Sequence, residues 1–98
     1  MLTFEKVLSV FADALDRDPL YEVVKTSRGY TLMGWEPTRE EWSRVEHMAT
    51  PEKLRDALLN NFATLLEDEI TGNERELTVE EQAGIDAECE KLKTLCRA

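Results

Sequence analysis

The segment LYEVVKTSRGYTLMGWEPTREEWSRVEHM, residues 20–48, decides the fold. Three runs rich in β-branched and aromatic side chains predict strands at residues 20–26, 30–36 and 41–48. The sequence Ser27-Arg28-Gly29 is typical of a tight turn with Gly29 at positive φ, and residues 37–40 are typical of a four-residue turn. Because consecutive strands usually pair with each other, the segment predicts a three-stranded antiparallel meander.

Helical patterns flank this segment on both sides. Apolar residues recur at helical spacing from Phe4 to Asp16, Thr3 is placed to cap this helix, and Asp18-Pro19 is expected to end it. Thr50-Pro51-Glu52 marks the start of a second helix, with an N-cap hydroxyl, a proline at the first position and an acid in the first turn. Gly72 is a suitable end for that helix.

A third helix begins at the capping box Thr78-Val79-Glu80-Glu81 and carries an apolar stripe that includes Ile85 and Leu92. The predicted order is therefore α-β-β-β-α-α. This order indicates an α+β fold of one domain, residues 1–98, in which three helices pack on the antiparallel sheet.

Alternation along the strands sorts the side chains of the sheet onto two faces. If Gly29 closes a three-residue turn, one face carries Tyr21, Val23, Met33, Trp35 and Trp42. The opposite face then carries Val24, Tyr30, Leu32, Val45 and His47. Trp35 and Trp42 become cross-strand neighbours, and a one-residue slip would exchange the faces. Two interpretations stay open: the tryptophans belong to the core, or they form a partly open surface for a partner or a homodimer.

The net charge is concentrated in one segment. Residues 67–90 contain ten acids and one base, so they carry −9, which equals the net charge of the whole chain. Acids in the first turn of the third helix stabilise it, but Glu67-Asp68-Glu69 stand at the end of the second helix, where the helix dipole disfavours anions. The segment is either a solubilising face or a binding surface for a basic partner. Its candidate binding residues are Glu67, Asp68, Glu69, Glu74, Glu76, Glu80, Glu81 and Glu88.

Spacing adds a more specific hypothesis to the charge. Carboxylates one helical turn apart are about 6 Å apart along the axis, comparable to the phosphates along a nucleic acid strand. Carboxylates on the end of the second helix, the loop and the start of the third helix could therefore mimic a row of phosphates. The partner would then be a protein with a nucleic-acid-binding surface.

Composition excludes several classes of protein. The isoelectric point near 4.6 argues against direct binding to nucleic acid or to an anionic membrane, because both need clustered Lys and Arg. No apolar run is long enough for a membrane span, and residues 1–5 do not resemble a secretory signal. Cys89 and Cys96 lie seven residues apart in one predicted helix, about 10 Å, which is beyond disulfide reach. A reducing, cytoplasmic location is expected.

Motifs for catalysis are missing. His47 is the only histidine, and no serine or cysteine is obviously placed to use it in a triad. The chain has too few Cys and His residues for a paired zinc site, and no glycine-rich phosphate loop. We therefore expect that the protein is not an enzyme and that it binds no metal and no cofactor.

Four short runs carry a resemblance to a known group of proteins: residues 2–8, 18–24, 26–30 and 49–52. The resemblance as a whole covers nearly the whole chain. In these runs, LTFEKVL, DPLYEVV, TSRGY and ATPE, the sequence resembles short acidic, largely uncharacterised cargo proteins of conjugative and phage-derived elements in Gram-positive gut bacteria. That resemblance transfers no active site. It implies a cargo-gene setting, in which small acidic proteins include inhibitors of host defence such as anti-CRISPR and anti-restriction proteins.

The α-β-β-β-α order also resembles the double-stranded RNA-binding domain. That family begins its second helix with a lysine cluster, whereas residues 50–53 here, Thr-Pro-Glu-Lys, are nearly neutral. The sequence therefore predicts a non-enzymatic protein-binding module. The more specific hypothesis is an inhibitor or DNA mimic that binds a basic surface of a nucleic-acid-handling protein. The alternative is a homo-oligomeric accessory domain whose acidic face serves solubility only.

Overall fold

A computed structural model describes residues 1–18 and 20–97. Two short helices, α1 (Phe4–Val10) and α2 (Ala12–Arg17), precede the strands β1 (Tyr21–Thr26), β2 (Gly29–Glu36) and β3 (Glu41–Met48). Two long helices follow, α3 (Pro51–Thr71) and α4 (Val79–Arg97). The α+β class and the meander order β1-β2-β3 are confirmed. Pro19, expected to end the first helix, lies outside the described residues.

The predicted helix caps form as local contacts. Thr3 and Thr50 each accept a hydrogen bond from the backbone N–H three residues on, at 3.1 and 3.2 Å. Gly72 ends α3 in the left-handed conformation, with φ 62°. The first helix differs from the prediction because it is interrupted at Phe11, which has φ −94° and ψ 8°. Backbone hydrogen bonds still link Phe11 to Val7 and Leu15, so α1 and α2 follow each other closely.

The register of the first hairpin differs from the prediction by one residue. Thr26 pairs with Gly29, so the loop contains two residues instead of three, although Gly29 has the expected positive φ of 109°. Tyr21 therefore faces the same side as Gly34, and it lies on the opposite face from Trp35. The prediction that Tyr21 and Val23 share a face with the tryptophans was wrong.

A bulge in β3 makes the pairing of β2 with β3 differ from the prediction. Trp35 pairs with Trp42 as predicted, but the register shifts between Leu32 and Gly34, where two β3 residues oppose Met33. One of the two, Arg44, has a positive φ of 51°. Beyond the bulge, His47 pairs with Thr31 instead of Tyr30, so the predicted grouping of His47 with Leu32 was also wrong.

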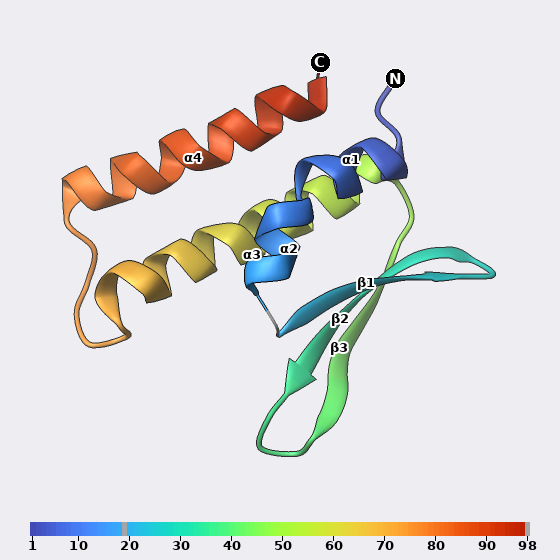
Figure 1. The fold of residues 1–98 in the computed structure, drawn as a ribbon, viewed down its shortest axis with the longest axis horizontal. Coiled ribbons are helices and arrows are strands. Elements are labelled where there is room, and N and C mark those ends of the chain that lie inside the picture. Colours follow the sequence, from blue (N-terminus) through green and yellow to red (C-terminus); the bar gives the residue numbers. More distant parts are fainter. Residues whose placement is uncertain (19, 98) are drawn as a thin grey trace.

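The described helices lie on one side of the sheet, as Figure 1 shows. The core joins Leu32 and Met48 of this face to helical side chains: Val7, Phe11, Leu54, Leu58 and Cys96. Tyr21 and Val23 pack against the same cluster, and the Phe4 and Tyr30 rings lie 4.7 Å apart. The other face carries Val24, Met33, Trp35 and Trp42, and we call it the open face.

Helices α3 and α4 form an antiparallel hairpin that extends beyond the sheet (Figure 1). Its free end consists of the last turn of α3, the loop 72–78 and the first turn of α4. Cys89 and Cys96 of α4 are both free thiols, and burial raises the pKa of each. None of the described helices has the length and apolar character needed to cross a membrane.

Candidate functional site

Seven of the eight predicted acidic residues come together at the free end of the helical hairpin. This group, which we call the acidic end, consists of Glu67, Asp68, Glu69, Glu74, Glu76, Glu80 and Glu81. All are exposed except Glu81, which is half-buried. Glu88 lies farther along α4 and pairs with Lys91 at 2.9 Å, so it is separate from the acidic end.

Two carboxylates of the acidic end are held by arginines. Arg17 of α2 binds both carboxylate oxygens of Glu69, a contact across 52 residues of sequence. Arg75 binds both oxygens of Glu81 at 2.8 Å. These pairs lower the number of charges that the acidic end offers to another molecule.

Glu81 has a structural role that its charge alone does not reveal. Its carboxylate accepts the backbone N–H of Thr78 at 3.0 Å, while the Thr78 hydroxyl accepts the N–H of Glu81 at 3.1 Å, which completes the predicted capping box. The Arg75 guanidinium, with the Thr78 N–H second, lowers the pKa of Glu81 from 4.5 to about 2. Arg75 also donates to the carbonyls of Glu76 and Ile70, so this pair orders the loop.

The remaining five carboxylates are Glu67, Asp68, Glu74, Glu76 and Glu80. Within residues 1–18 and 20–97, none of them forms an ion pair with a lysine or an arginine. They are exposed, and they stand on a helix end, a loop and a helix start that follow one another in sequence. The acidic end therefore keeps a cluster of uncompensated negative charge.

Two exposed apolar side chains belong to the same segment as these carboxylates, and neither was predicted as a candidate. Ile70 in the last turn of α3 is 39% exposed, and Val79 at the start of α4 is 88% exposed. Exposed apolar side chains next to charged residues in sequence are typical of a protein interface, which has an apolar centre and a polar rim. For Val79 a signal was present, because it lies off the apolar stripe of its helix.

The aromatic candidate residues divide between the two faces of the sheet. Trp35 and Trp42 lie on the open face with their ring centroids 5.1 Å apart and an angle of 70° between them, an edge-to-face pair. Met33 shares this face, and Trp42 is 39% exposed. Tyr21 lies on the covered face, where its hydroxyl accepts a hydrogen bond from Arg44 at 3.4 Å. Tyr21 therefore does not belong to the aromatic surface on the open face.

Groups suited to metal binding do not occur in the described part of the chain, where no three His, Cys, Asp or Glu side chains converge. Comparison with known proteins gives no match to any family model, curated protein or solved structure.

Proposed function

We propose that this protein is a non-enzymatic binding module whose acidic end docks on a basic surface of another protein. The observation that carries the proposal is the group of five exposed carboxylates that form no ion pair among the described residues, in the same segment as exposed Ile70 and Val79. Charge would steer the partner and set the orientation, and the apolar side chains would supply the contact area that excludes water.

Local energetics support a role beyond stability. Asp68 stands in the last turn of α3, where an anion costs about 0.3–1 kcal/mol through the helix dipole, and Glu67 directly precedes that turn. No basic residue occupies that last turn to offset them. Placing acids where they weaken the helix is consistent with selection for a surface property.

The partner that fits best is a protein with a nucleic-acid-binding groove. Such a groove is built to receive a row of negative charges, and the acidic end offers carboxylates from a helix end, a loop and a helix start that follow one another. The resemblance to cargo proteins of mobile elements favours an inhibitor of this kind, acting in the cytoplasm against a host-defence protein.

The experiment compares charge reversals at two places. The variant Glu67→Lys with Asp68→Lys removes two unpaired charges of the acidic end, and the control Glu22→Lys with Glu46→Lys makes the same change in net charge on the sheet. Each protein is immobilised, partners are captured from a lysate of Gram-positive gut bacteria, and captured partners are purified and titrated at low and moderate salt.

Loss of a partner on the acidic-end variant, with retention on the control, would support the proposal, as would displacement of that partner by duplex DNA. The salt dependence of its affinity should also flatten in the acidic-end variant. Equal affinity of wild type and acidic-end variant for every captured partner would refute it.

The open face favours a second candidate function, a homodimer. Met33, Trp35 and Trp42 form an apolar, aromatic surface on the face of the sheet opposite the core that the described helices build. Trp42→Glu should convert such a dimer to a monomer, whereas Leu95→Glu, on the exposed surface of α4, should not. Sedimentation equilibrium at about 100 µM measures the difference, and a wild-type monomer at that concentration would exclude a stable dimer.

A further inference from the structure

We infer that a hollow at the far end of the sheet, between Tyr21 and Arg44, binds the carboxylate of a small apolar ligand. The hollow has a volume of about 160 Å³, and Leu20 and Trp35 contribute to its walls. Its described walls are the three strands with the adjoining residues Leu20 and Pro37, and they include no residue of the acidic end. The two sites can therefore be tested separately.

Gly34 keeps this hollow open. A Cβ atom at position 34 would lie 3.5 Å from Cε1 of Tyr21, 3.6 Å from the carbonyl oxygen of Ser43 and 3.7 Å from Cβ of Arg44. These are ordinary van der Waals distances, so alanine would fit, but a longer side chain would fill the space between the three residues. Glycine in a strand often marks a place where another group approaches the backbone closely.

Arg44 is held in an unusual conformation at the edge of the hollow. It belongs to the bulge opposite Met33, and its φ of 51° is uncommon for a residue other than glycine. Bulges redirect side chains, and strained backbone positions cluster at binding sites. Here the bulge places the Arg44 guanidinium 3.4 Å from the Tyr21 hydroxyl.

The guanidinium has donors to spare. Among the residues that the structure describes, Arg44 forms no ion pair, and its one side-chain hydrogen bond is to Tyr21. A planar guanidinium binds a carboxylate through two parallel hydrogen bonds. The hydroxyls of Tyr21 and of half-buried Ser43, which also lines the hollow, are further donors for such a group.

Size and charge narrow the class of ligand. Pockets for drug-sized ligands have volumes of about 300–1,000 Å³, so this hollow fits a single ring or one amino-acid side chain. Glu36 also lines the hollow, and its carboxylate is bound by the Thr38 hydroxyl at 2.7 Å. That negative charge disfavours a phosphate dianion more than a monocarboxylate. The ligand is therefore a monocarboxylate with a small apolar group, either a free acid or the C-terminus of a peptide.

The test is a titration of the full chain followed by the backbone amide signals of Gly34 and Ser43 in NMR spectra. The probes are benzoate, its neutral analogue benzamide, and the peptide acetyl-Gly-Gly-Phe as free acid and as amide. We expect saturable shifts with the two acids and at least about tenfold weaker binding of the two neutral compounds.

Variants of Arg44 test whether its guanidinium group binds the acid. Arg44→Gln should weaken acid binding at least about tenfold, and Arg44→Lys should weaken it less, because lysine keeps the charge but loses the planar fork. Arg28→Gln is the matched control, since Arg28 is exposed in the other turn of the sheet, and it should bind as wild type. Retained amide dispersion confirms that each variant is folded.

The outcomes distinguish the two ligand sources. Tighter binding of the peptide acid than of benzoate identifies a peptide C-terminus, and the reverse identifies a free small acid. The inference is overturned if neither acid gives saturable shifts below about 10 mM, if the neutral compounds bind equally well, or if Arg44→Gln binds as wild type. None of these outcomes bears on the acidic end.

Discussion

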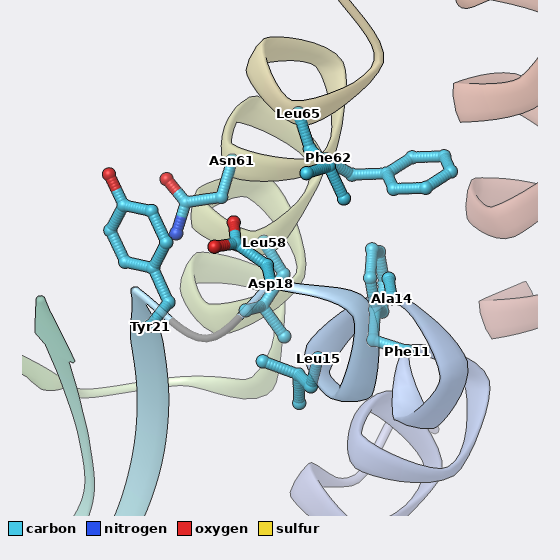
Figure 2. A pocket seen from close by; sticks show the side chains of 9 residues that line it. All are labelled: Phe11, Ala14, Leu15, Asp18, Tyr21, Leu58, Asn61, Phe62 and Leu65. Carbon is cyan, nitrogen blue, oxygen red and sulfur yellow. The ribbon is translucent and has the colours of Figure 1, made fainter. Parts of the chain in front are cut away.

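Replacing Asn61 by leucine tests how the helices are packed on the start of the sheet. Asn61 lies on α3 and lines a cavity of about 10 Å³ together with Phe11, Asp18 and Tyr21. Figure 2 shows the Asn61 side chain at this cavity, whose other walls are mainly apolar. Its Nδ2 atom is buried and has no hydrogen-bond partner among the described residues.

The size of the effect follows from three terms. A buried donor without a partner costs about 1–3 kcal/mol, and leucine removes this cost with a side chain of the same branching. Leucine also favours the helix over asparagine by a few tenths of a kcal/mol. Against these gains, leucine is larger, and the cavity of about 10 Å³ is at the lower limit of what holds one water molecule, so overpacking offsets part of the benefit. We expect Asn61→Leu to raise the free energy of unfolding by about 1 kcal/mol.

Urea unfolding measures this change, with the midpoint rising by about 0.5–1 M at an unchanged slope. The matched control is Asn60→Leu, because Asn60 is the exposed neighbour on the same helix and gains only the difference in helix propensity. The reasoning is wrong if Asn61→Leu stabilises the protein no more than the control, or if it destabilises it. Either result would mean that the loss of an Asn61 hydrogen bond, for example to an internal water, or the overpacking by leucine outweighs the gain from removing a buried donor.

Three further predictions concern stability. Gly84→Ala should stabilise the protein by about 0.5–1 kcal/mol, because among the described residues the added methyl group meets nothing within 4 Å apart from its chain neighbours and its own helix backbone. Gly72→Ala should destabilise it by about 1–2 kcal/mol at φ 62°; thermal unfolding that gave both the same sign would contradict this. Glu81→Gln should lower the urea midpoint at pH 7. This loss should fade as the pH falls from about 4.5 to about 2, because the ion pair that depresses the pKa of Glu81 stabilises the folded state only while Glu81 is ionised. A loss independent of pH would be inconsistent with the ion pair to Arg75. Leu54→Ala, at a fully buried position, should cost about 2–5 kcal/mol in urea unfolding, and a cost below 1 kcal/mol would show that the core is placed wrongly.

The helix boundaries could be predicted because their signals are local. Thr50, Gly72 and Thr78 each act on backbone groups within four residues, and each forms the contact expected of it. The composition of the acidic end was predictable for the same reason, since its residues are close in sequence. Its partial neutralisation was not, because Arg17 and Glu69 are separated by 52 residues.

The sheet faces could not be predicted because the pattern of apolar residues is ambiguous. Val23 and Val24 are adjacent and point to opposite faces, so apolar alternation fits either register. Ser27-Arg28-Gly29 is compatible with a hairpin loop of two or three residues. In the structure Thr26 pairs with Gly29, so the loop has two residues. The bulge at Arg44 had no signal, since arginine is not a residue that favours positive φ.

The candidate carboxylate site depends on these two details of register. With a three-residue loop, Tyr21 would share a face with Trp35 and would lie on the opposite side of the sheet from Gly34. The two-residue loop instead brings the Tyr21 ring next to Gly34, and the bulge brings Arg44 to the Tyr21 hydroxyl. A shift of one residue therefore removes Tyr21 from an aromatic surface and makes it a wall of the hollow beside Arg44. For this reason the acidic end follows from composition, whereas the hollow follows only from the pairing of strands.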